Sequence, residues 1–66
     1  MKIRSIEYND DHGCSKIIEV GKDDVENIIE HQAQGEGDRW FYDVKYSNGN
    51  VDRMFNVVKV SFINTN

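Results

Sequence analysis

The clearest pattern in the sequence is a pair of segments with alternating apolar and polar residues on either side of Asn48-Gly49. An Asn-Gly pair in this position is the strongest short-range signal for a hairpin with a two-residue type I′ turn. That turn would pair Val44 with Arg53 and would sort the side chains of both strands into two faces. The apolar face would carry Trp40, Tyr42, Val44, Tyr46, Val51, Phe55 and Val57. We therefore predict a hairpin over residues 39–57 and expect Trp40 to lie in the core.

Phe41 and Met54 fall on the opposite face of this hairpin, among polar side chains. Apolar side chains on an otherwise polar face mark a candidate contact surface, unless a second layer covers them. In the same register Arg53 falls on the apolar face, where its stem would pack while the guanidinium reaches solvent or stacks on a neighbouring tyrosine. The pattern thus predicts a small binding patch at Phe41 and Met54, and a structural role for Arg53.

Three further segments have the pattern of short strands. Residues 2–8 and 16–20 flank NDDHGCS, a stretch of turn-forming residues, and would form a hairpin. Near the C-terminus, Val60 and Phe62 alternate with polar residues in a short final strand. The order of these segments predicts a sheet-rich fold with antiparallel neighbours.

Residues 24–33 fit two different structures. Asp23 and Glu26 have the spacing of a helix capping box, and the apolar residues that follow share one helical face. The same residues are mostly β-branched, which favours a strand. A strand at 25–32 would pair with residues 39–46 through the glycine-rich loop between them.

Residues 40–62 carry a resemblance to a known class of fold. The sequence of these residues is WFYDVKYSNGNVDRMFNVVKVSF. Together with the segment before them, they give the order strand, glycine-rich loop, aromatic strand, tight turn and two short strands. This order resembles the SH3-like and Tudor-like small β-barrels. The resemblance implies a strand at 25–32 and ligands that are peptides or cations.

The predicted fold class is therefore mostly β. We expect a small SH3-like barrel, or a strongly twisted antiparallel meander of roughly five to six strands. The alternative is an α+β fold in which a short helix at about 24–33 packs on an antiparallel sheet.

Length and cysteine content limit the fold further. The chain has 66 residues, which predicts a single domain over 1–66. Cys14 is the only cysteine, so no internal disulfide forms. No apolar segment approaches the roughly 20 residues that cross a bilayer, and the N-terminal segment lacks the apolar core of a signal peptide. We expect a cytoplasmic protein.

The charge distribution suggests the kind of partner. The formal net charge is −4, and the eight Lys and Arg residues form no stripe, which argues against direct nucleic-acid binding. The acidic residues cluster beside glycines, at Asp10-Asp11, at Asp23-Asp24, and at Glu36 with Asp38. These clusters either keep loop tips solvated or form an anionic patch for a basic partner.

Catalytic and metal-binding patterns are weak. His12 and Cys14 lie too close together in a turn to form a nucleophile–base pair, and this spacing lacks the paired ligands of a zinc site. Gly35-Glu36-Gly37 is not a phosphate loop, because no lysine follows and Glu36 repels phosphate. We expect no enzyme activity, no cofactor and no metal.

The sequence thus predicts a small acidic module that binds another protein. Its partner would have a basic surface, which the module would occupy in the manner of inhibitors or accessory proteins from phages and mobile elements. The alternative is a Tudor-like or SH3-like reader, or a subunit of a larger assembly, with a cationic or peptide ligand; no membrane partner is expected, and self-association stays open. The candidate binding residues are Asp23, Asp24, Glu36, Asp38, Phe41 and Met54.

Overall fold

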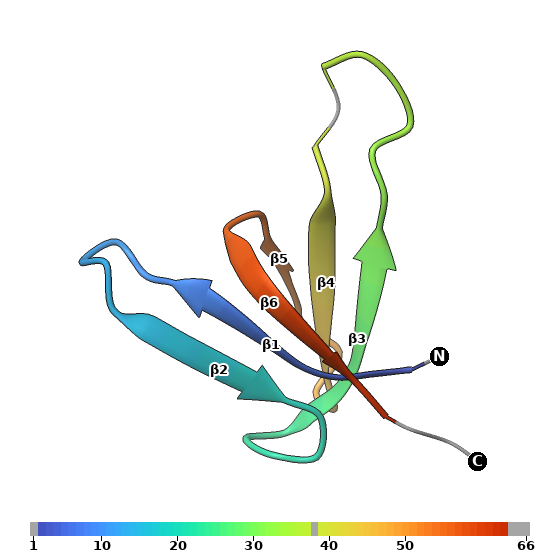
Figure 1. Ribbon diagram of the computed structural model, residues 1–66. Coiled ribbons are helices and arrows are strands. Elements are labelled where there is room, and N and C mark those ends of the chain that lie inside the picture. The colour runs from blue at the N-terminus through green and yellow to red at the C-terminus, as the bar shows by residue number, and fades with distance from the viewer. Residues whose placement is uncertain (1, 38, 64–66) are drawn as a thin grey trace.

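The computed structural model describes residues 2–37 and 39–63, and in this part of the chain the regular structure is all β (Figure 1). The strands are β1 (Ile3–Asn9), β2 (Ser15–Glu19), β3 (Val25–His31), β4 (Phe41–Tyr46), β5 (Val51–Met54) and β6 (Val57–Phe62). The mostly-β prediction is confirmed. The alternative helix at about 24–33 is wrong, because β3 occupies most of that segment. Within the described residues, no helix could cross a membrane.

The strands form two antiparallel sheets of three strands each, with the orders β2-β1-β6 and β3-β4-β5. The last strand pairs with the first, so Phe62 lies opposite Ile3. The second sheet is a simple meander. Two short links, from β2 to β3 and from β5 to β6, carry the chain from one sheet to the other (Figure 1).

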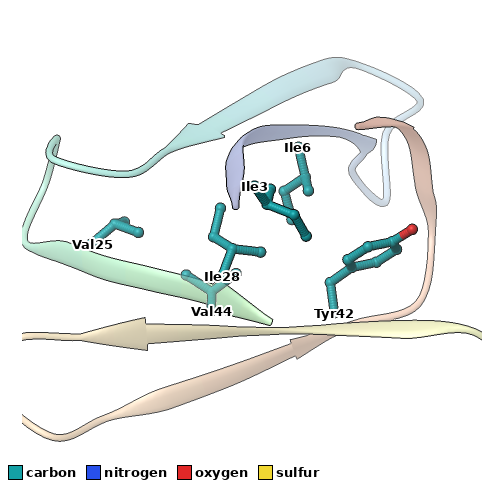
Figure 2. Close-up of a cluster of buried hydrophobic side chains, with 6 residues drawn as sticks. All are labelled: Ile3, Ile6, Val25, Ile28, Tyr42 and Val44. Carbon is teal, nitrogen blue, oxygen red and sulfur yellow. The ribbon is translucent and has the colours of Figure 1, made fainter. Parts of the chain in front are cut away.

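The core lies between β1 of the first sheet and the β3–β4 pair of the second (Figure 2). It consists of Ile3, Ile6, Val25, Ile28, Tyr42 and Val44. Ile6 and Val44 are the most deeply buried, at 1% and 0% exposure. Figure 2 shows the side chains from β1 directed towards those from β3 and β4. Burying these apolar groups is the main force that holds the two sheets together.

Irregular pairing explains why β3 resembled a helix in the sequence. Val25 and Ile28 are both buried although they are three residues apart, and the pairing with β4 shifts between Val25 and Asn27. A bulge of this kind inserts one extra residue, which brings positions i and i+3 to the same face of a strand. The Asn27 side chain accepts the Ile28 N–H at 2.9 Å beside this shift. The apolar spacing therefore marks a bulged strand.

The register of the β4–β5 hairpin differs by one residue from the prediction. Asp43 lies opposite Arg53, and Tyr42 lies opposite Met54. The Tyr46 N–H bonds to the Asn50 carbonyl at 2.9 Å, which leaves a loop of three residues. Gly49 has φ +92°, whereas Asn48 is not among the described non-glycine residues with positive φ. This is a type I turn closed by a left-handed glycine, not the type I′ turn that Asn-Gly suggested.

The register change reverses the side chains of β5. Met54 packs against the core, whereas Arg53 and Phe55 lie on the outer face near Phe41. The prediction that Trp40 is buried is wrong, since its exposure is 51%. Phe55, also predicted to be on the apolar face, is 44% exposed. A one-residue slip moves the side chains of β5 to the other face, which accounts for the exposure of Phe55. The slip leaves the faces of β4 unchanged, so it does not account for Trp40, which precedes that strand.

Candidate binding surface

Four side chains form a connected cluster on the outer face of the β3–β4–β5 sheet. Asp43, on the central strand, is only 8% exposed. Its Oδ2 lies 3.1 Å from His31 Nε2 on β3, and its Oδ1 accepts the Arg53 Nε–H from β5 at 3.1 Å. Phe41 stacks on the His31 ring at 4.6 Å, and the Arg53 guanidinium lies 4.2 Å from the Phe41 centroid. The cluster links all three strands of the sheet.

The β-sheet geometry places these groups together. Phe41 and Asp43 are two residues apart on β4 and therefore share a face. His31 lies directly opposite Phe41, and Arg53 lies directly opposite Asp43. Each pair is close enough for cross-strand contact. The buried carboxylate thus has a cationic partner and a histidine, as a charge taken out of water requires.

Phe55, just after β5, extends this face towards the end of the sheet. Its ring lies 5.6 Å from that of Phe41, and the Arg39 guanidinium lies 4.9 Å from its centroid. Trp40 is the residue next to Arg39 and is half-exposed. Phe55 and Arg39 therefore present an aromatic ring and a guanidinium to solvent at the base of the β3–β4 loop.

Two cavities adjoin at Phe55. The first, of about 350 Å³, lies against the β3–β4 loop and is lined by Gln32, Gln34, Gly37, Arg39, Phe41 and Phe55. The second, of about 340 Å³, lies against the β1–β2 loop and is lined by Tyr8, Asn9, Asp10, Asp11, Arg53, Met54, Phe55 and Asn56. In Figure 1 the β5–β6 link lies between these two loops. We call the two cavities and the ring that they share the Phe55 surface.

The two halves of the Phe55 surface differ in charge. The half at the β1–β2 loop contains Asp10, Asp11 and Arg53, and Arg53 is already paired with Asp43. Asp10 has a structural role, because its Oδ1 accepts the N–H groups of His12 and Cys14 at 2.9 Å each. Asp11 is exposed. The other half contains Arg39 and no acidic residue among its described lining.

Tyr42, a buried tyrosine of β4, lies on the inner side of the β3–β4–β5 sheet. The Tyr42 hydroxyl donates to the Glu30 carboxylate at 3.1 Å. Burial, with a further effect of the nearby Glu30, raises the pKa of Tyr42 above its ordinary value of 10.0. Tyr42 therefore stays protonated at neutral pH and serves as a hydrogen-bond donor in the core.

The structure separates the predicted binding residues into different places. Phe41 belongs to the Phe55 surface. Met54 lines the cavity at the β1–β2 loop and also packs against the core. Glu36 is exposed in the β3–β4 loop and lines neither cavity. Asp38 lies outside the described residues.

Asp23 and Asp24 lie near the other end of the sheet, in the link between β2 and β3. Their φ angles are +53° and +65°, and the Val25 N–H bonds to the Lys22 carbonyl at 3.0 Å. These are the features of a type I′ turn, in which both central residues have positive φ. Aspartate is one of the few residues other than glycine that tolerates this conformation. The turn accounts for both residues without any ligand.

Sequence reasoning missed Phe55 and Arg39 as surface residues. The signal that could have found Phe55 is the turn itself. Asn48-Gly49 also fits the end of a three-residue loop, and that register puts Phe55 on the same face as Phe41. Arg39 had no signal of its own, because its position over Phe55 depends on how the long loop returns to β4.

Other candidates for chemistry remain dispersed. Cys14 is an exposed free thiol in the β1–β2 loop. Across residues 2–37 and 39–63, no group of three His, Cys, Asp or Glu side chains is placed to hold a metal ion. A further cavity of about 400 Å³ lies nearer the other end of the β3–β4–β5 sheet, around Glu26, Lys45 and Lys2. It has no aromatic residue in its described lining.

No protein-family model, curated protein or solved structure was found to match the chain. The site must therefore be interpreted from its own geometry.

Proposed function

We propose that this chain is a noncatalytic protein-binding module, and that it binds an extended segment of another protein across the Phe55 surface. The observation that carries this proposal is that Phe55, 44% exposed, is shared by two adjoining cavities of about 340 and 350 Å³. In protein interfaces a few residues near the centre, often large side chains that fill a pocket, supply most of the binding energy, and Phe55 is placed to be one of them.

The architecture supports a module of the SH3-like type. The first strand pairs with the last, a three-strand meander forms the second sheet, and a short link joins β5 to β6. The sequence of residues 40–62 has the strand order that resembles these small barrels. In the proposed complex, the β1–β2 and β3–β4 loops flank the bound segment.

Charge favours a basic partner. The chain has a formal net charge of −4, and Asp11 is exposed on one half of the surface. A lysine or arginine of the partner would pair with this half, and the overall charge would accelerate association. A module of this kind acts by occupying a basic surface, as small inhibitors and accessory proteins of phages and mobile elements do.

The alternative of a Tudor-like reader has less support. Such readers enclose a ligand cation in aromatic rings. Here the guanidinium groups of Arg39 and Arg53 already lie over Phe55 and Phe41, at 4.9 and 4.2 Å from the ring centroids. A ligand cation would have to displace an arginine of the protein itself.

A library of ten-residue synthetic peptides with a fixed central leucine and random flanks tests this proposal. We expect the immobilised protein to enrich peptides that carry Lys or Arg on one side of the leucine. Phe55→Ala should lower the affinity for the enriched peptides by about tenfold or more, as expected for a residue that supplies much of the binding energy. Phe62→Ala is the matched control, because Phe62 is 45% exposed and lies on β6, outside both cavities. Absence of enrichment, or equal losses in the two variants, would overturn the proposal.

A further inference from the structure

We propose that Arg39 binds a carboxylate of the partner segment, so that the ligand combines an apolar residue with a basic group on one side and an acidic group on the other. This inference rests on the proposed function and specifies the ligand class of the same surface. It concerns the half of the Phe55 surface beside the β3–β4 loop.

The two stacked arginines of this face differ in what they bind. Arg53 lies over Phe41 and donates its Nε–H to the buried carboxylate of Asp43. Arg39 lies over Phe55, but it takes part in none of the ion pairs formed within the part of the chain that the structure describes. Arg53 therefore has a structural partner in the sheet, whereas Arg39 is placed to receive one from outside.

Stacking prepares a guanidinium for a planar anion. A ring against the face of the guanidinium restricts its orientation, while the N–H groups remain in the plane at its edge. A carboxylate can accept two parallel hydrogen bonds from this edge. The described lining of this cavity contains no acidic group that would repel such a guest.

The opposite charges of the two halves define a direction along the surface. The half on the β1–β2 side holds the exposed Asp11 and an arginine, Arg53, that is already paired with Asp43. Arg39 lies in the other half, and both halves share Phe55. A segment with uniform positive charge would meet Arg39 unfavourably, because like charges repel across an interface. A segment with one basic and one acidic group around a central apolar residue satisfies both halves.

The same peptide library tests this inference when the residue preferences are determined separately for the two sides of the leucine. The wild-type protein should enrich Asp or Glu on the side opposite the Lys or Arg preference. Arg39→Gln should remove the acidic preference, and Arg39→Glu should replace it with a basic one, each changing relative affinity by about three- to tenfold. Both variants should keep the basic preference on the other side. Arg4→Glu is the control, since it makes the same charge change at an exposed position of β1, outside both cavities.

The outcomes separate the two proposals. If the wild-type protein shows the basic preference without an acidic one, or if the Arg39 variants leave the acidic preference unchanged, the role of Arg39 is refuted and the binding function stands. If no flanking preference appears at all, both proposals are refuted. A change in Arg4→Glu as large as that in Arg39→Glu would show a general charge effect and would also refute the role of Arg39. Circular dichroism of each variant confirms that it is folded before the comparison.

Discussion

Replacing Asp43 with asparagine should destabilise the protein by about 1–2 kcal/mol. The substitution keeps the shape of the side chain but removes its charge and one of its two acceptor oxygens. Asp43 is 8% exposed and binds His31 and Arg53 at 3.1 Å each. A hydrogen bond to a charged group contributes about 1.5–3 kcal/mol when it is shielded from water. The side chains of His31 and Arg53 are 42% and 56% exposed, so solvent screening lowers this figure.

The measurement is urea unfolding at pH 7, followed by far-UV circular dichroism. Total stability for a chain of this size is about 3–10 kcal/mol, so the expected loss is a large fraction of it. The free energy of unfolding of a small protein falls by about 1 kcal/mol per molar urea, so the midpoint of urea unfolding should fall by roughly 1–2 M. Asp52→Asn is the control on the next strand. Within residues 2–37 and 39–63, the Asp52 side chain accepts one hydrogen bond, the exposed one from Tyr46, so this change should cost less than about 0.5 kcal/mol.

A double-mutant cycle shows whether the loss comes from the cluster itself. Arg53→Met keeps most of the stem that packs and removes the guanidinium. If Asp43 and Arg53 act together, the double variant should be more stable than the sum of the single changes predicts, by at least about 0.5 kcal/mol. Additive effects, or an Asp43→Asn variant as stable as the wild type, would refute the assignment of this carboxylate as the link between the three strands.

Three further predictions follow from burial, turn geometry and the pKa of a tyrosine. Ile6→Ala should cost about 2–5 kcal/mol in urea unfolding, since Ile6 is 1% exposed, whereas Trp40→Ala should cost less than about 1 kcal/mol; equal losses would contradict the assigned core. Asp24→Gly should raise the thermal midpoint, adding about 0.5–1 kcal/mol, because Asp-Gly suits a type I′ turn better than Asp-Asp; a lower midpoint would contradict that turn. The pKa of Tyr42 is higher in the folded than in the unfolded protein, so the stability that its protonated hydroxyl contributes is complete below pH 10.0. This stability is lost as the pH rises through the pKa of the folded state. Above pH 10.0 the Tyr42→Phe variant should therefore lose less stability than the wild type, and identical pH profiles would contradict the raised pKa.

Much of the fold could be predicted from the sequence, because short strands leave a local signature. Alternation and turn residues indicated an antiparallel β fold, and they correctly placed Tyr42 and Val44 in the core. The choice between helix and strand at 24–33 could not be made locally. The bulge in β3 gives apolar residues a spacing of three, which is also the spacing of a helical face.

The binding surface was less predictable than the core, because it depends on one residue of register. Both turn types accept Asn-Gly, and only the backbone conformation of Asn48 separates them. The turn type decides whether Met54 or Phe55 lies on the same face of the sheet as Phe41. The position of Arg39 depends on tertiary structure, since the loop that carries it has no pattern of its own.

The central claim, that the Phe55 surface binds a protein segment, is tested most directly by NMR titration. The titrant is the synthetic peptide most strongly enriched from the library, added to the ¹⁵N-labelled protein. We predict that the largest shifts occur at the amides of Asp11, Arg39, Phe55 and Asn56, and that the amides around Lys45 and Glu26 change little. Shifts centred on the cavity around Lys45 and Glu26, or no shifts at all, would contradict the claim.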